Sequence, residues 1–292
     1  MNFRKSLMAA TLGIASALPM AASAITIDGI TFEIGAIFET LDLFEGRQCN
    51  AGDADFGSCT NGGPITAVGQ ELTGIGRVNR IYDSGLNDLW VDGDNGRELT
   101  LYFYDYVAES IDVLDSPNPF PDFALIQFSG GVVEIYSQTA GTFDPAAPFQ
   151  DSINSAKSGS LWLSLTGSPI GGLVNGNNIT LSSLTQGNNP LSNGIVTGDG
   201  LLDVTGGAAA EYFDTDSFGC LDNSLDGCPD SADKKFVSSG SLVVNPTAGA
   251  WAFKGTGTVD DVAAIPEPTS LALLGAGLVG AGLSARRRRK AA

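Results

Sequence analysis

The chain has 292 residues, with 33 acidic against 15 basic side chains and a formal net charge of −18 at pH 7. This excess of negative charge repels nucleic acid and anionic membranes, and it excludes a nucleic-acid-binding protein. Because the chain contains no histidine, Ser-His-Asp catalysis, Cys-His catalysis and every His-ligated metal site are excluded as well.

Residues 1–24 have the layout of a secretory signal peptide, which would be exported by the Sec machinery. Arg4 and Lys5 form a positive start, an apolar stretch follows, and Ala22-Ser23-Ala24 supplies the small residues that precede a cleavage site. We therefore expect the mature chain to start at Ile25. The alternative is an uncleaved N-terminal membrane anchor, which the short apolar stretch disfavours.

Residues 25–264 form the expected exported body, in which helical periodicity is nearly absent. Short segments of alternating apolar and polar residues are bounded by Gly, Asn, Pro and Asp, a pattern typical of half-buried strands. Gly130-Gly131 between two such segments predicts a hairpin turn, and residues 167–200 are expected to form long loops or poorly ordered strands. The pattern favours an all-β fold, an antiparallel β-sandwich or jelly-roll-like body. The expected strands are 25–27, 30–34, 99–104, 124–128, 132–136, 161–165, 201–205, 236–244 and 251–259.

Four cysteines, Cys49, Cys59, Cys220 and Cys228, fall into two close pairs. Disulfides fit an exported protein, and bonding within each close pair is the simplest of the three possible connectivities. A structural zinc site is the alternative, but no C-x-x-C spacing supports it.

Carboxylates are the abundant chemical groups of the body, and one turn gathers several of them. Asp92, Asp94, Asn95 and Glu98 place oxygen atoms in a Gly-containing segment, and Ca²⁺ prefers such ligands. A complete EF-hand loop would need a glutamate where Phe103 stands, so plain Asp/Gly turns in solvent compete with this interpretation. No other cofactor is expected. Further Asp-x-Asp pairs lie near the cysteines, at Asp53 and Asp55 and at Asp214 and Asp216.

The C-terminal tail has three parts in a fixed order. Pro266-Glu267-Pro268 comes first, and an uncharged apolar run follows over residues 269–285. This run is at the short end of the about 17–25 residues that a transmembrane helix needs, and the cations after it would stay in the cytoplasm. Those cations are Arg286, Arg287, Arg288, Arg289 and Lys290. A plain C-terminal membrane anchor is one interpretation of this order.

Residues 265–292 also resemble the PEP-CTERM sorting signal of Gram-negative bacteria, which has the same three parts. The resemblance implies that a membrane-embedded exosortase recognises the tail and removes it. The precursor would be held in the inner membrane by its single C-terminal transmembrane helix, and the body would end at the cell surface or in the extracellular matrix.

The leading functional hypothesis is therefore a non-enzymatic surface or matrix protein involved in adhesion, exopolysaccharide association or biofilm and floc formation. Tyr102, Tyr104 and Tyr106 alternate along one expected strand and could stack on sugars, or they could belong to the core. The alternative is an exported enzyme that cleaves polysaccharide with paired carboxylates. The sequence does not show which pair of carboxylates would face a common cleft, so we predict no catalytic residue.

Overall fold

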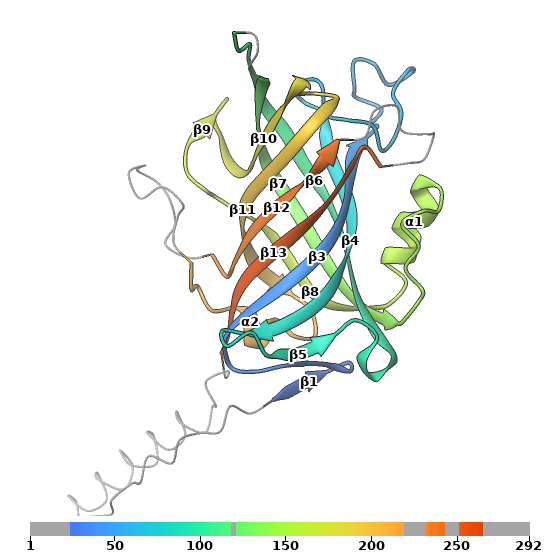
Figure 1. Cartoon of the computed structure of the whole chain (residues 1–292), viewed down its shortest axis with the longest axis vertical. Coiled ribbons are helices and arrows are strands. Elements are labelled where there is room, and N and C mark those ends of the chain that lie inside the picture. Colours follow the sequence, from blue (N-terminus) through green and yellow to red (C-terminus); the bar gives the residue numbers. More distant parts are fainter. Residues whose placement is uncertain (1–23, 118–120, 219–231, 243–250, 265–292) are drawn as a thin grey trace, which may run out of the picture.

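The computed structural model describes residues 24–117, 121–218, 232–242 and 251–264, in which β-strands are the dominant secondary structure (Figure 1). A single 3₁₀ turn among them, η1, covers Asp94–Gly96. The helices in these ranges are α1, Phe149–Ala156, and α2, Ala210–Phe213. The strands are β1 Ile25–Ile27, β2 Ile30–Phe32, β3 Gly35–Gln48, β4 Glu71–Asp83, β5 Asp88–Val91, β6 Arg97–Leu114, β7 Asp122–Thr139, β8 Ser160–Ser168, β9 Leu173–Val174, β10 Asn177–Asn189, β11 Asn193–Gly206, β12 Lys234–Leu242 and β13 Phe253–Ala263.

The main sheet of the described residues closes on itself as an eight-strand antiparallel barrel (Figure 1). Its neighbours follow the order β12-β13-β3-β4-β6-β7-β8-β11, and β11 pairs with β12 to complete the ring. Two strands, β8 and β10, share the position in the ring between β7 and β11. Strand β8 pairs with residues 132–137 of β7 and β10 pairs with residues 122–129, so the two strands lie one after the other along β7.

The all-β class and the antiparallel pairing are confirmed, but the expected β-sandwich or jelly roll is wrong. A sandwich has two sheets, each with free edges, whereas the ring gives every one of its eight positions a hydrogen-bonded neighbour on both sides. Closure removes the exposed edges and places one face of every strand inside the barrel.

Strand β7 is continuous where a hairpin was expected at Gly130-Gly131, so that prediction is wrong. The two glycines have φ of 73° and 97°, and the strand bends there without reversing. The ring of Tyr106 on β6 lies against this bend, and a Cβ at Gly131 would overlap it. The glycines therefore make room for an aromatic side chain inside the barrel. Residues 167–200, expected as loops or poorly ordered strands, contain β10 and the first half of β11.

Strand β3 contributes apolar side chains to the lining of the barrel and also two acidic side chains that point inward. Ile37, Leu41 and Leu43 point inward and are almost fully buried. Glu39 and Glu45 have the same alternation along the strand, so their carboxyl groups also point into the barrel. Two acids in an inward register are unusual, since burial of a charge costs free energy unless the charge is paired.

One end of the barrel, which we call the base, is covered by the β1–β2 hairpin and α2 (Figure 1, lower end). Phe32 of β2, Trp162 of β8 and Phe213 of α2 pack together there, with ring centroids 4.9–6.1 Å apart. All three side chains have no exposed surface. An aromatic plug therefore seals this end.

Helix α1 covers part of the outer surface of β4 and β6 (Figure 1). Phe149 and Ile153 of the helix pack with Ile75 of β4 and with Trp251 in a second hydrophobic cluster. The hydroxyl of Thr100 on β6 donates to the last helical carbonyl of α1, at 2.7 Å. The outer face of the barrel is thus partly buried on this side.

A disulfide between Cys49 and Cys59 closes the loop that follows β3, which confirms the expected local pairing. The same loop folds around Arg47, whose side chain is buried. Its guanidinium donates to the carboxylates of Asp53 and Asp55. These acids therefore neutralise an internal cation.

Several predictions concern segments outside the described residues: most of the signal peptide, Cys220 with Cys228, the Pro266-Glu267-Pro268 motif, the apolar run 269–285 and the basic block after it. Ile25, the expected first residue of the mature chain, is the first residue of β1. None of the helices within the described ranges is long and apolar enough to cross a membrane.

Candidate functional site

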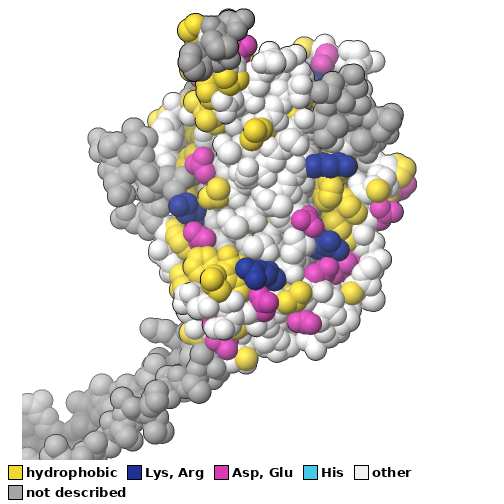
Figure 2. Space-filling view, viewed as in Figure 1, with side chains coloured by type: hydrophobic (Ala, Val, Ile, Leu, Met, Phe, Trp, Pro, Cys, Tyr) yellow, Lys and Arg dark blue, Asp and Glu magenta, His cyan; other side chains and the backbone are white. Residues whose placement is uncertain are grey.

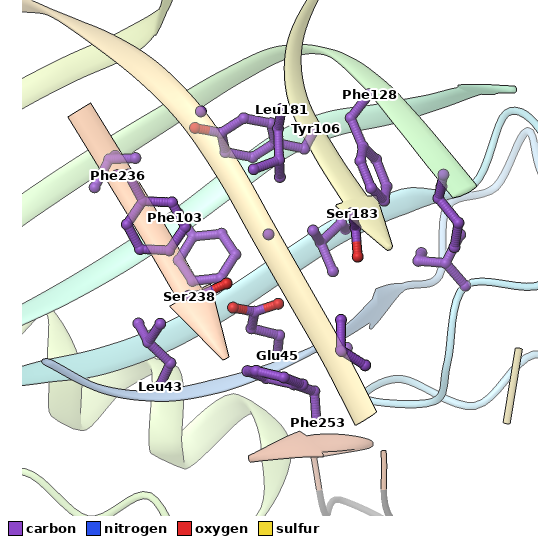
Figure 3. Close-up of a pocket in the computed structure, with 18 of the residues that line it drawn as sticks. Leu43, Glu45, Phe103, Tyr106, Phe128, Leu181, Ser183, Phe236, Ser238 and Phe253 are labelled. Atoms are coloured by element: carbon purple, nitrogen blue, oxygen red, sulfur yellow. The ribbon is translucent and has the colours of Figure 1, made fainter. Parts of the chain in front are cut away.

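The barrel encloses a cavity of about 110 Å³ whose lining is mostly apolar (Figure 3). Aliphatic and aromatic side chains from strands on all sides of the ring form its wall. The apolar lining residues labelled in Figure 3 are Leu43, Phe103, Phe128, Leu181, Phe236 and Phe253. Hydroxyl groups of Tyr106, Ser183, Thr185 and Ser238 are the neutral polar groups of the lining.

Glu45 brings a carboxyl group into this cavity without a partner. No described residue forms a hydrogen bond or an ion pair with its side chain, and the carboxyl group points into the cavity (Figure 3). Removal from water raises the pKa of Glu45 to about 8, because nothing nearby stabilises the charged form. The carboxyl is therefore mainly protonated at neutral pH when the cavity is empty.

Glu39 lies nearer the base and has a quite different environment. Lys234 Nζ lies 3.2 Å from Glu39 Oε1 and also contacts the Asp261 carboxylate, and all three side chains are almost completely buried. The ammonium also lies 4.4 Å from the centre of the Phe213 ring. Burial lowers the pKa of Lys234, and its attraction to Glu39 opposes that shift. The buried charges near the base are therefore paired with one another.

The outer surface of β6 and β7, together with the residue that follows α1, forms a group that we call the tyrosine face: Tyr102, Tyr104, Tyr136, Glu134 and Lys157. The Tyr102 and Tyr104 rings are stacked, with centroids 4.9 Å apart and planes 19° from parallel. Lys157 Nζ lies 4.5 Å from the Tyr102 centroid, and the Tyr136 hydroxyl donates to Glu134 at 2.7 Å. Desolvation raises the pKa of all three phenols, so they are neutral.

Tyr106 does not belong to the tyrosine face, although alternation along the strand would place it there. Asp105 has φ of 62° and forms a bulge, so that Phe103 pairs with Gly74 and Tyr106 pairs with Leu72. The extra residue turns Tyr106 into the barrel, where its side chain is buried. The expected three-tyrosine alternation is therefore wrong at its third member.

The predicted calcium ligands Asp92, Asp94 and Asn95 are engaged in different contacts. Asp92 Oδ2 lies 3.1 Å from Arg77 Nη1. Asp94 accepts the Val91 N–H, and the Asn95 amide donates to a backbone carbonyl of the β1–β2 turn. These contacts hold the turn in place.

Glu98, the fourth predicted calcium ligand, is buried and points to another turn. Its carboxylate accepts hydrogen bonds of 2.7–3.0 Å from the Gln138 amide and from the backbone N–H groups of residues 141–143. The structure thus does not bring the four predicted ligands together.

A different trio of acids does converge. Within the described residues, Asp214, Asp216 and Asp233 place one carboxylate oxygen each within 4.8 Å of the others. Asp233 is buried and already accepts N–H groups from Thr215 and Asp216. Asp214 and Asp216 are exposed, and their sequence pair was recognised as a source of oxygen ligands.

The charges on the face of the barrel seen in Figure 2 are dispersed. On the face of the barrel that carries β3, β11, β12 and β13, acidic and basic side chains are scattered and form no single patch (Figure 2). No broad charged surface is therefore available there to attract a polyelectrolyte.

Sequence analysis missed Glu45 and Lys234 because neither residue lies in an expected strand. The signal that could have found Glu45 is the spacing of β3: Ile37, Glu39, Leu41, Leu43 and Glu45 share one face, so the acids occupy positions where apolar residues are the rule.

The body described above is that of a barrel-like all-β protein. Residues 264–289 match the family model of the PEP-CTERM protein-sorting motif. The chain therefore carries a PEP-CTERM protein-sorting motif at its C-terminal end, and this motif supports an exported protein that is sorted by exosortase. No curated protein and no solved structure shows significant similarity to it.

Proposed function

We propose that the body is a non-enzymatic surface or matrix protein that associates with exopolysaccharide through the tyrosine face and thereby supports adhesion and biofilm or floc cohesion. The observation that carries the proposal is the stacked pair Tyr102 and Tyr104 on the outside of the barrel. Such a pair offers a flat apolar surface with polar tips.

The groups around the pair suit a sugar. A sugar ring has an apolar C–H face and a rim of hydroxyl groups, so it can stack on phenol rings and hydrogen-bond beside them. Glu134 supplies acceptors and Lys157 supplies donors at the edge of the pair, with Lys157 Nζ 3.4 Å from Glu134 Oε2. Because the chain is strongly acidic, a neutral polysaccharide is a more favourable partner than an acidic one.

Co-sedimentation of the processed, exported protein with exopolysaccharide from its own cells tests the proposal. Tyr104→Ala is expected to weaken binding by about tenfold, while Tyr104→Phe retains most of it, because the ring provides the contact. The matched control is Tyr82→Ala, which removes one ring of a second stacked outer pair, Phe38 and Tyr82. Equal losses in Tyr82→Ala and Tyr104→Ala would exclude the tyrosine face as the specific site.

The same incubation tests the absence of enzymatic activity. The chain length of the polysaccharide is expected to remain unchanged after prolonged incubation with the protein. Shortening of the polysaccharide would favour the alternative, an exported carboxylate-dependent enzyme.

Sorting has its own test. Replacing Pro266-Glu267-Pro268 with alanines is expected to leave an unprocessed precursor in the membrane, whereas the native chain loses its tail. Intact-mass analysis of protein from the cell exterior reports both ends of the mature chain. Full-length protein there, with Arg286 to Lys290 still present, would contradict trimming.

Calcium binding stays a prediction. The acids best placed for it in the described residues are Asp214, Asp216 and Asp233. Calorimetric titration with CaCl₂ is expected to show heat that Asp214→Asn removes, and the melting temperature is expected to rise with CaCl₂. The absence of both effects would end the idea.

A further inference from the structure

The barrel interior contains one carboxyl group whose presence the fold alone does not explain. Glu45 faces a cavity of about 110 Å³ and has no hydrogen-bonding or ionic partner among the described residues. An apolar residue at this inward position would avoid the cost of removing a carboxyl group from water. A partner that arrives from outside the chain would compensate that cost.

The barrel's own cation cannot reach Glu45. Lys234 is the one basic residue of the cavity lining within the described chain, and it is paired with Glu39 and Asp261 near the base. Glu39 and Glu45 are six residues apart on one strand, which corresponds to about 20 Å. The positive charge that would pair with Glu45 is therefore missing from the lining.

The rest of the lining indicates the shape of the missing group. Hydroxyls of Ser183 and Ser238 border the Glu45 end (Figure 3). A primary ammonium has three N–H donors, so it can pair with the carboxylate and still donate to hydroxyl oxygens. Beyond these groups the wall is aliphatic and aromatic, which suits an unbranched hydrocarbon tail.

We propose that the barrel binds a small primary alkylamine, whose ammonium group pairs with Glu45 and whose hydrocarbon chain lies in the apolar cavity. A cavity of this size accommodates a chain on the order of four to six carbons. A diamine is disfavoured because its second cation would approach Lys234, whose two acids are already occupied. This ligand is independent of the polysaccharide proposed for the outer face.

The proposal has a specific proton balance. Near neutral pH the free amine is protonated and so is Glu45 in the empty cavity, because burial raises the pKa of Glu45 to about 8. Binding forms an ammonium–carboxylate pair, and the carboxyl proton leaves to the buffer. Of the other titratable lining groups, Tyr106 has a raised pKa and stays neutral, and Glu39 and Lys234 are paired with each other.

The test is isothermal titration calorimetry of the processed protein with hexylamine in two buffers that differ in ionisation enthalpy. We expect saturable binding, release of about one proton near pH 7, and affinity at least about tenfold higher than for 1-hexanol or hexanoate. Glu45→Gln is expected to lower the hexylamine affinity by at least about tenfold and to abolish proton release. The matched control, Glu211→Gln, changes an exposed acid on α2 and is expected to bind as the wild type does.

Three results would overturn the proposal: no saturable hexylamine binding, equal affinity for hexylamine and 1-hexanol, or unchanged binding in Glu45→Gln. A denaturant unfolding curve verifies that each variant is folded. Should Glu45→Gln fail to fold, Ser183→Leu provides the test, because it fills space beside Glu45 and leaves the carboxyl in place. Unchanged hexylamine affinity in folded Ser183→Leu would exclude the cavity as the site.

Discussion

Glu39 and Glu45 point into the same barrel from the same strand, β3, but they lie at opposite ends of the interior. Near the base, beside the aromatic plug of Phe32, Trp162 and Phe213, Glu39 has an ammonium partner at 3.2 Å. At the other end Glu45 has an apolar wall, hydroxyl groups and open cavity.

The difference separates a structural charge from one that is available for binding. The Lys234 group is complete, so any foreign ligand there would have to break existing contacts. Glu45 has no contact to lose, and its environment is destabilising until a cation arrives. The paired end and the unpaired end should therefore respond in opposite directions to mutation.

The largest expected effect comes from breaking the paired end. Lys234→Met replaces the ammonium with an apolar side chain of similar length and leaves Glu39 and Asp261 buried without a cation. This loss of pairing should lower the free energy of unfolding by about 3–5 kcal/mol. Urea unfolding curves measure this change in the free energy of unfolding. Lys235→Met, one residue along β12, is the control and should change stability by no more than about 0.5 kcal/mol. A Lys234→Met protein as stable as this control would show that the charges need no pairing.

A smaller effect is expected from the disulfide at the Glu45 end. Cys49→Ser with Cys59→Ser opens the loop that follows β3, and this should cost about 2–3 kcal/mol. Hydrogen exchange locates the change: amides near the end of β3 should exchange faster, while those around Trp162 at the base should not. Uniform acceleration over both ends would mean that the two regions are not independent.

The pH dependence of stability sharpens the comparison further. The pKa of Glu45 is about 8 in the folded state against an ordinary 4.5, so the folded protein keeps a proton that the unfolded chain has lost. The free energy of unfolding should therefore fall as pH rises through this window, by up to about 1.4 kcal/mol per pH unit. Unfolding curves at several pH values measure the slope, and Glu45→Gln should remove it.

Asp53 and Asp83 act outside that window. Hydrogen bonds lower the pKa of Asp53 and Asp83, so the stability that these acids contribute is lost only under more acidic conditions. A slope between pH 5 and pH 8 that persists in Glu45→Gln would assign the effect to another group.

The sequence predicted the all-β class and several strands because alternation of apolar and polar residues is a local property, but β3, β4 and β10 were not among the expected strands. Strands such as β8 and β13 were identified within a few residues. Ring closure could not be predicted, since it depends on the pairing of β11 with β12 and on β8 and β10 sharing one edge. These are contacts between segments far apart in the chain.

The candidate sites show the same division. The tail motif is a local pattern, and it was recognised from Pro266-Glu267-Pro268 and the residues after it. Tyr106 was misplaced because a single bulge at Asp105 reverses the direction of the side chains that follow. Glu45 was missed because β3 was not among the expected strands, and because the burial of an acid in a strand depends on the whole ring.

Infrared difference spectroscopy of the carboxyl groups tests the central claim most directly, because a protonated carboxyl and a carboxylate absorb at different frequencies. Spectra of the ligand-free protein near pH 7, with Glu45→Gln as the reference, should contain one protonated carboxyl that belongs to Glu45. Hexylamine should convert that signal to carboxylate. A Glu45 carboxyl that is already ionised in the empty protein, or one that hexylamine leaves unchanged, would contradict the account.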